Sequence, residues 1–162
     1  MVRLKARYIL FDILYPPTTK PLERYSERDT LLALHSTSPG LSSRTIADIV
    51  RKQIQIYFGD HGAGVVGLSL MVKYFSPKTS TGIIRCSRDH YQLVCAALTM
   101  INSIGSKDVI VRVVRVSGTI KKCEQAAVER NRDLMRLMEK QYDDEEEKEI
   151  MNIEEDEEDR DD

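Results

Sequence analysis

The sequence is poor in aromatic residues, which make up 6% of its 162 residues and include no tryptophan. Proteins that read single-stranded RNA on a β-sheet stack the bases on aromatic side chains. Only Tyr8 and Phe11 of the first expected strand could serve in this way, and the expected third strand, TSTGIIRC, has no aromatic residue. The shortage argues against sequence-specific stacking on the sheet and favours recognition of a backbone or a shape.

Cysteine is also scarce, with three residues at positions 86, 95 and 123. An odd and widely spaced set does not suggest a disulfide framework, so we expect a reducing compartment. No apolar run approaches the about 20 residues that span a membrane. The basic N-terminus, MVRLKAR, is not followed by an apolar signal region. We therefore expect a soluble intracellular protein.

Charged residues are abundant but unevenly distributed, and the net charge of −2 conceals this. Residues 143–162 include 14 acidic and 2 basic residues, which leaves 22 basic and 12 acidic residues, a net of +10, over 1–142. A cationic domain favours a polyanionic partner, most often nucleic acid, although a merely basic surface has the same composition. The acidic tail, 143–162, cannot offset its ordering entropy by burying apolar surface, so we expect it to be disordered.

The apolar patterns predict an α+β domain over residues 1–142. Strands are expected where apolar residues alternate or are β-branched, and helices where they recur at helical spacing. The expected strands are 2–15, the two arms of a hairpin within 65–89, and 109–116; the expected helices are 43–58 with Gly59 as its C-cap, one from Ser87 or Asp89 to Gly105, and 120–142. The order β-α-β-β-α-β is that of the antiparallel ferredoxin-like fold, also used by RNA-recognition modules, with an added C-terminal helix. Residues 18–42 are interpreted as an elaboration with a short helix over 26–34.

Features typical of enzymes are present only in the wrong context. Residues 62–67, GAGVVG, match the dinucleotide fingerprint, but they follow an expected helix and precede an expected strand, the reverse of what a pyrophosphate site requires. We interpret them as a flexible loop. His35, His61 and His90 lack the spacing of a zinc site, and the anion-binding loop of acylphosphatase, an enzyme of this fold, is not evident. The sequence leaves a Cys–His pair open, but Cys95 and Cys123 lie on expected core faces.

The expected hairpin has the most distinctive chemistry of the chain. Its sequence, VVGLSLMVKYFSPKTSTGIIRCSRD, places basic residues among hydroxyl side chains, a combination that suits phosphate oxygens. The first strand begins with basic residues alternating with Val2, Leu4 and Ala6, and from Tyr8 to Leu14 almost every residue is apolar. A partner or the last helix is therefore expected to cover the sheet.

Three separated blocks of the sequence resemble one known family. They are MVRLKARYILFDILYPP (1–17), YFSPKTSTGIIRCSRD (74–89) and VSGTIKKCEQ (116–125). In this order they resemble fungal members of the Pop-five family, small protein subunits of ribonuclease P and ribonuclease MRP. The resemblance spans most of residues 1–130, is weakest over 18–42 and is absent from the tail.

The resemblance implies a non-catalytic subunit that braces a catalytic RNA. The RNA with its metal ions would remove the 5′ leader of precursor tRNA, the MRP particle would cleave ribosomal RNA precursors, and this chain would bind no cofactor itself. The implied partners are ribonuclease P RNA, MRP RNA, precursor tRNA in the assembled particle, a TIM-barrel-type subunit and a second small ferredoxin-like subunit, without a membrane. The implied location is the nucleus, mainly the nucleolus.

Residue chemistry and resemblance together select the expected RNA contacts, with no catalytic and no metal-binding residue. The set comprises Arg3, Lys5, Arg7, Lys73, Lys78, Thr79, Ser80, Thr81, Arg85, Arg88, Lys121 and Lys122. Lys121 and Lys122 open the expected last helix, whose free N–H groups also favour an anion. The alternative function is a protein-only scaffold or adaptor in a nuclear complex, which would recruit partners through the acidic tail or the covered sheet face.

Overall fold

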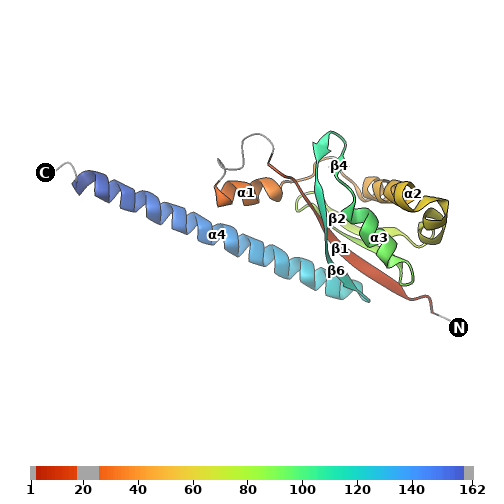
Figure 1. The fold of residues 1–162 in the computed structure, drawn as a ribbon. Coiled ribbons are helices and arrows are strands. Elements are labelled where there is room, and N and C mark those ends of the chain that lie inside the picture. The colour runs from red at the N-terminus through yellow and green to blue at the C-terminus, as the bar shows by residue number, and fades with distance from the viewer. Residues whose placement is uncertain (1–2, 18–25, 159–162) are drawn as a thin grey trace.

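A four-stranded antiparallel sheet forms the centre of the molecule (Figure 1). The computed structural model describes residues 3–17 and 26–158, with side chains described up to Glu139 apart from Arg28. The strands are β1 (Ala6–Leu14), β2 (Met71–Ser76), β3 (Thr81–Ser87) and β6 (Ile110–Ser117), in the order β2-β3-β1-β6. Each neighbouring pair is antiparallel. The expected ferredoxin-like topology is confirmed.

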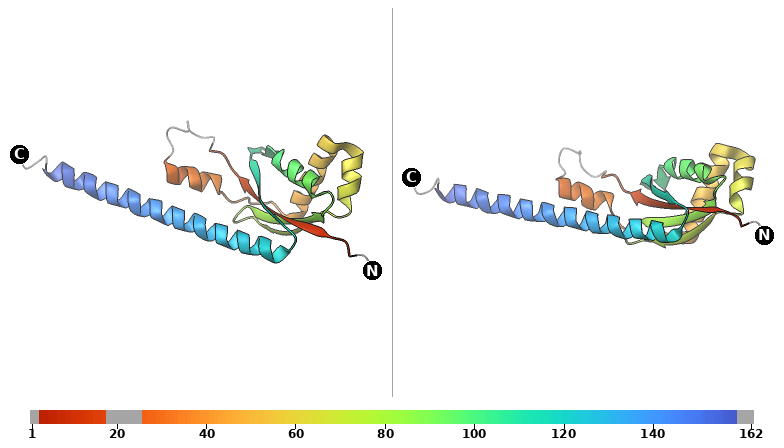
Figure 2. Two further views of the ribbon diagram at one scale, coloured as in Figure 1. Left: turned by 60° about the horizontal axis from the view of Figure 1, so that its bottom comes forward. Right: turned by 90° about the horizontal axis from the view of Figure 1, so that it is seen from below.

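Helices cover both faces of this sheet (Figures 1 and 2). The helices α2 (Ser43–Gly67) and α3 (Tyr91–Thr99) pack on one face, and α4 (Ile120–Glu158) crosses the other and continues well beyond it. The short helix expected near residue 26 is present as α1 (Glu27–Leu34), capped by the Ser26 hydroxyl, which accepts from the Asp29 N–H at 3.1 Å. It contacts α4. A small hairpin of β4 (Ser103–Ile104) and β5 (Lys107–Asp108) precedes β6.

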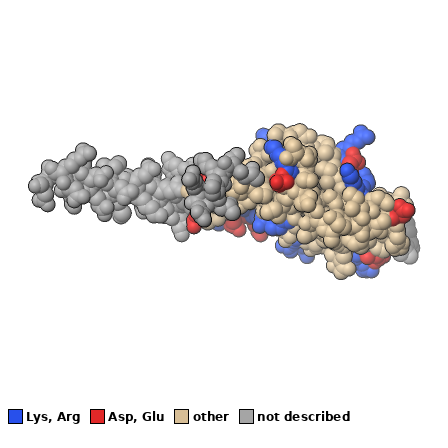
Figure 3. All heavy atoms as spheres, turned by 45° about the horizontal axis from the view of Figure 1, so that its top comes forward, with Lys and Arg blue, Asp and Glu red and all other residues tan. Residues whose placement is uncertain are grey.

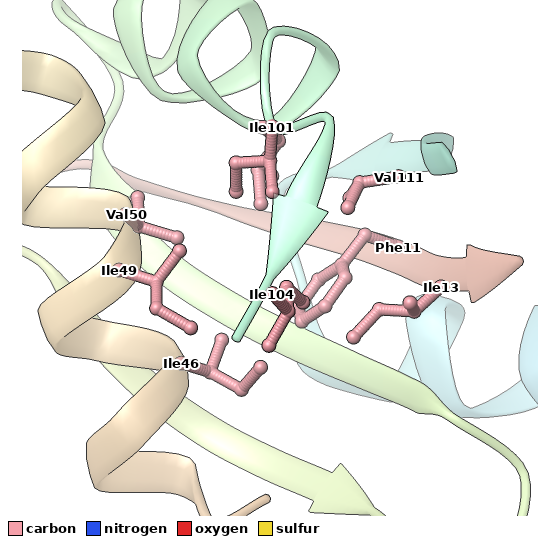
Figure 4. A pocket seen from close by; sticks show the side chains of 9 residues that line it. Phe11, Ile13, Ile46, Ile49, Val50, Ile101, Ile104 and Val111 are labelled. Atoms are coloured by element: carbon pink, nitrogen blue, oxygen red, sulfur yellow. The ribbon is translucent and has the colours of Figure 1, made fainter. Parts of the chain in front are cut away.

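The core between the sheet and the α2/α3 layer is wholly apolar (Figure 4). Phe11 of β1 stacks on Phe75 of β2, with ring centroids 6.4 Å apart and an interplanar angle of 13°. The cavity drawn in Figure 4 has a volume of about 10 Å³, no more than one water molecule needs, and an apolar lining. Its lining includes Phe11, Ile13, Ile46, Ile49, Val50, Ile101, Ile104 and Val111. This cavity is a packing gap and not a ligand site.

The opposite face of β1 is buried beneath α4. Leu10, Ile83 and Cys123 form a second, smaller buried cluster there, at 0%, 1% and 0% exposed. The residues of β1 therefore alternate between two cores, which explains why the strand is apolar on both faces. The prediction that a partner or the last helix covers the sheet is resolved in favour of the helix.

The main error of the sequence interpretation lies between residues 59 and 70. Gly59 has φ +64° and ψ −162°, which kinks the helix without the left-handed conformation of a usual helix-ending glycine. The chain then forms a second helical segment up to Gly67, where a loop and the start of a strand were expected. The GAGVVG motif is thus helical and not a loop. A Cβ on Gly62 would lie 2.4 Å from the Phe58 Cβ, so the tight return after the kink depends on a residue without a side chain. Leu68, expected within the first arm of the hairpin, follows this helix and is 100% exposed.

Other boundaries also differ from expectation. The first strand begins at Ala6 rather than residue 2, and residues 1–2 lie outside the described part. Helix α3 ends at Thr99, and Gly105, the expected end of that helix, lies with φ +61° between β4 and β5. Helix α4 continues past the expected end at 142 to Glu158, where disorder was expected. No proline or glycine interrupts residues 120–158, and glutamate, lysine, arginine and methionine all favour a helix. Residues 159–162 lie outside the described part.

Among the described residues, no helix combines the length and the apolar character that crossing a bilayer requires.

Candidate nucleic-acid interface

A groove lies where β1 begins and β3 ends. It has a volume of about 630 Å³ and is lined by the N-terminal segment 3–6, the end of α2, the first residue of β2, and residues 85–90. Four of the expected contacts line it together: Arg3, Lys5, Arg85 and Arg88. These residues are separated by about 80 positions in the sequence and are brought together by the antiparallel pairing of β1 with β3. We call this feature the N-terminal groove.

Backbone hydrogen bonds fix the walls of the N-terminal groove. The Arg88 N–H donates to the Lys5 carbonyl at 3.0 Å, which continues the β1–β3 contact beyond both strands. The Ser69 hydroxyl accepts from the Ser87 N–H at 3.2 Å and donates to the Val66 carbonyl at 3.2 Å. The end of α2 is therefore tied to the end of β3. The backbone at Lys5 and at Arg88 is therefore held in place by hydrogen bonds.

The charge of this groove is strongly positive. Asp89 is the only carboxylate in its lining, and it lies 3.7 Å from the Arg88 guanidinium in an exposed pair. Such exposed pairs contribute little to stability, so Arg88 can exchange partners at small cost. Figure 3 shows Lys and Arg at several separate places on the face in view rather than in one continuous patch. The groove is where the structure concentrates the expected contacts.

Four further expected contacts lie outside the groove, three of them near the same end of the sheet. Arg7 is half-buried, donates to the Ala6 carbonyl and lies beside Gly118, just before α4. Lys121 and Lys122 are exposed in the first turn of α4, as predicted. Lys73 is also exposed, at an irregularity of β2 between Val72 and Tyr74. None of these four side chains lines the groove.

The turn between β2 and β3 lies at the other end of the sheet from the groove. The length of β3 separates the two by about 20 Å. Ser80 is 0% exposed, and its hydroxyl donates to the Ser36 carbonyl at 2.7 Å. The Ser38 hydroxyl lies 2.7 Å from that of Ser80 and also bonds to the Tyr15 hydroxyl. Since Ser80 has one proton, Ser38 donates to it and Tyr15 donates to Ser38.

This hydroxyl chain corrects the prediction for Ser80. Its hydroxyl is committed inside the protein, where it ties the turn to the end of β1 and to residues 36–38, so it is not available to a phosphate. Thr79 and Thr81 are half-buried, and the Thr81 hydroxyl donates to the Thr79 carbonyl at 3.1 Å. Only Lys78 of this group is exposed. Its contact with RNA stays a prediction, and it would belong to a surface separate from the groove.

The sheet face that RNA-recognition modules use for base stacking is occupied here by α4. Asp12 of β1, 5% exposed, receives hydrogen bonds from Arg112 of β6 at 3.2 and 2.9 Å and lies 2.5 Å from the Arg130 guanidinium of α4. Burial raises the pKa of the Asp12 carboxyl, and the Arg112 guanidinium acts in the opposite direction. This ionic cluster (Asp12, Arg112, Arg130) holds α4 over the part of the face formed by β1 and β6. Tyr74 of β2, which pairs with Ile83 on the same face, is 49% exposed.

The sequence interpretation missed the apolar part of the N-terminal groove. Leu4, Leu68 and Met71 line it and are 88%, 100% and 49% exposed. Leu68 and Met71 had been placed within a strand of 65–74, and period-two alternation carries no signal that a helix ends there. His90, at the N-cap of α3, lines the groove too and makes no side-chain cap hydrogen bond.

The cysteines do not form a reactive site. Burial, with a smaller contribution from Cys95, raises the pKa of Cys86 to about 12. Burial also raises the pKa values of Cys95 and Cys123. Raised pKa values disfavour the nucleophilic thiolate. Within residues 3–17 and 26–158, no group of three or more His, Cys, Asp or Glu side chains is arranged to hold a metal ion.

A model of the Rpp14/Pop5 family matches residues 7–128, which include all of the sheet except Ala6 and also the first part of α4. The chain belongs to the Rpp14/Pop5 family. The resemblance expected from the three blocks is thereby confirmed. The family match begins at Arg7, so Arg3 and Lys5 of the groove lie before it.

Curated relatives agree with this family assignment. "Ribonuclease P/MRP protein subunit POP5" of Saccharomyces cerevisiae is 47% identical over 141 residues, which cover 85% of this chain and 82% of the relative. The protein of the same name in Schizosaccharomyces pombe is 47% identical over 132 residues, 82% of this chain and 89% of the relative. "Ribonuclease P protein component 2" of Pyrococcus horikoshii is 30% identical over 111 residues, 68% of this chain and 86% of the relative. One chain of the "Cryo-EM structure of yeast Ribonuclease MRP" aligns at a TM-score of 0.45 with 11% identity, covering 82% of this chain and 96% of that one.

Proposed function

We propose that this member of the Rpp14/Pop5 family is a non-catalytic protein subunit of ribonuclease P and ribonuclease MRP. The observation that carries the proposal is 47% identity to two yeast subunits over more than four fifths of the chain. In this proposal the RNA of each particle, with its metal ions, performs the cleavage, which is removal of the tRNA 5′ leader or processing of ribosomal RNA precursors. The protein braces the RNA and binds no cofactor of its own.

The N-terminal groove supports a contact with RNA. Arg3, Lys5 and Arg88 are exposed and Arg85 is half-buried around one concave surface, and a polyanion that neutralises them gains from counterion release. The surroundings of the cysteines argue against a thiol nucleophile, because burial raises the pKa of each thiol. We expect the isolated chain to turn over neither precursor tRNA nor acyl phosphates.

Replacement of the yeast subunit tests this proposal. Saccharomyces cerevisiae cells depleted of their own POP5 subunit would express this chain with an affinity tag. We expect ribonuclease P RNA and MRP RNA to co-purify with the chain, and precursor tRNA with an intact 5′ leader to disappear from the cells. If neither RNA co-purifies under conditions where the tagged yeast subunit retrieves both, the proposal is wrong.

We further propose that the chain acts in the nucleus, mainly the nucleolus, beside a TIM-barrel-type subunit and a second small ferredoxin-like subunit. Exposed apolar side chains on α4, at Val128, Met135 and Leu137, support protein contacts in the particle. They also favour the second candidate function, a scaffold held only by proteins. Retention of the chain after nuclease digestion of the particle, together with absence of RNA crosslinks at the groove, would select the scaffold.

A further inference from the structure

The N-terminal groove has an apolar lining that phosphate binding does not explain. Leu68 is 100% exposed and Leu4 is 88% exposed, and Met71 beside them is 49% exposed. Burying one such side chain is worth about 1.5–3 kcal/mol. A single exposed leucine is ordinary, but three large apolar side chains around one concave, cationic surface indicate a ligand with both charged and apolar parts.

The size of the groove fits a ligand that enters it. Its volume of about 630 Å³ lies within the about 300–1,000 Å³ of sites that hold a small organic molecule. The cleft beside the kink of α2 holds about 150 Å³, and the gap in the core about 10 Å³. A double helix placed against the groove would present mainly phosphates and sugars, because its bases are stacked inside. The apolar lining would then stay in water.

We propose that the N-terminal groove takes an unpaired RNA nucleotide, with its phosphates on Arg85 and Arg88 and its base against Leu68 and Met71. This inference rests on the proposed function and specifies its ligand as single-stranded. Unpaired bases are free to leave the stack and to lie on apolar side chains or on the plane of a guanidinium. Helix α4 covers the part of the sheet face formed by β1 and β6, and the groove offers a base contact outside that covered part.

Equilibrium binding by the full chain tests this assignment. The probes are a labelled octamer of uridine, an octamer of abasic ribose phosphate with the same charge, and an RNA duplex of eight base pairs. We expect the uridine octamer to bind more tightly than either of the other two. Leu68→Ser should weaken uridine-octamer binding by about fivefold, which matches the lower end of the range for a base stacked on an aromatic side chain, and should leave abasic-octamer binding unchanged.

Matched variants separate the two parts of the groove. Arg88→Ala should weaken binding of both single-stranded probes and reduce the slope of log affinity against log salt by about 0.7. Leu32→Ser removes a leucine that is 48% exposed on α1, outside the groove, and should change neither affinity. Because Leu68 and Leu32 are both exposed, neither serine is expected to unfold the protein, which thermal melting checks.

Several outcomes would overturn the inference. Equal binding of the uridine and abasic octamers, tighter binding of the duplex, or no effect of Leu68→Ser on uridine binding would each show that no base enters the groove. An oligoglutamate peptide that displaces the octamer and is itself weakened by Leu68→Ser would assign the groove to an acidic peptide instead. Failure of the proposed function is distinct, because the wild-type chain would then retrieve neither ribonuclease P RNA nor MRP RNA from cells.

Discussion

The two faces of the sheet are stabilised in different ways. On the α2/α3 face, Ile9, Phe11 and Ile13 pack into a large core of apolar side chains from four strands and two helices. On the α4 face, the buried residues are Leu10, Ile83 and Cys123, supplemented by the ionic cluster of Asp12 with Arg112 and Arg130. Apolar burial is strong but not directional, whereas a buried ionic cluster fixes one arrangement at a desolvation cost. The first face thus supplies most of the stability, and the second positions a helix.

The largest expected effect comes from breaking the α2/α3 core. Phe11 and Leu10 are chain neighbours, 1% and 0% exposed, and face opposite sides. Phe11→Ala should reduce the free energy of unfolding by about 3–5 kcal/mol, because its neighbours are held on all sides and leave a cavity. Leu10→Ala should cost less, about 2–3 kcal/mol, since α4 can settle onto the gap. Urea unfolding of both variants measures the difference.

Hydrogen exchange on the same variants sharpens the contrast. Leu10→Ala should lower the protection of amides in residues 120–139 while the amides of α2 stay protected. Phe11→Ala should lower protection throughout the sheet. Equal losses of stability, with the same pattern of exchange, would mean that the two faces form one cooperative unit and that the contrast does not hold.

The ionic cluster gives the next effect in size. Asp12→Ala removes the hydrogen bonds to Arg112 and the contact with Arg130, and we expect a loss of about 1–3 kcal/mol. The loss is limited because the Arg112 side chain is 46% exposed and water can replace its partner. Asp48→Ala is the matched control, since Asp48 lies 3.9 Å from Arg51 in an exposed pair, and should change stability by less than about 0.5 kcal/mol. Denaturant melts that show the same loss for both variants would remove the cluster from the account of α4.

Part of this contrast was predictable from the sequence, because almost every residue of β1 from Tyr8 to Leu14 is apolar and a helix with an apolar stripe follows the last strand. The ferredoxin-like order also followed from periodicity. The ionic cluster could not be predicted from the sequence, since Asp12 and Arg112 are separated by 100 positions and only the β1–β6 register brings them together. Nothing in the sequence marks one arginine among many as the partner of a buried aspartate.

The candidate site was predictable only in part, for similar reasons. Basic residues of two separate segments were selected, and the β1–β3 pairing joins Arg3 and Lys5 to Arg85 and Arg88. Residues 65–70 were interpreted as part of a strand, because a short apolar alternation fits a strand and the end of a helix equally. The exposure of Leu68 at the end of α2 was therefore not predicted. Ser80 was selected for its hydroxyl, and no local pattern shows that Ser36 and Ser38 use that hydroxyl inside the protein.

The rate at which buried thiols are labelled compares the two faces, and here we expect a smaller difference than in the stability measurements. Cys86 lies in the α2/α3 core and Cys123 under α4, at 1% and 0% exposed, and burial raises the pKa of both. Each thiol reacts only when its face opens. In chains that keep one of these cysteines, with the other two changed to alanine, Cys123 should be labelled by a disulfide reagent at pH 8 several times faster than Cys86. Faster labelling of Cys86 would reverse the assignment of the weaker face.

The smallest expected effect is a pH dependence confined to the α4 side. His35 is the C-cap residue of α1, near Asp12 and Arg112. Burial lowers the pKa of His35, Asp12 opposes this shift and Arg112 adds to it. The unfolded chain therefore binds this proton more readily than the folded one, so stability is complete above about pH 6.5 and falls as the pH drops below it.

His35→Gln removes that proton and should flatten the dependence between pH 7.5 and 5.5, by a fraction of the Asp12→Ala effect. The raised pKa of Asp12 has the opposite effect, because the folded protein binds that proton more firmly and gains stability as the pH falls. The quantity to compare is therefore the difference in pH dependence between the wild-type chain and His35→Gln. Hydrogen exchange at the two pH values locates the effect, since acid should loosen α4 near Arg130 and leave α2 unchanged. A pH dependence that survives His35→Gln, or that affects α2 equally, would separate His35 from the ionic cluster and leave α4 positioned by Asp12 and its two arginines alone.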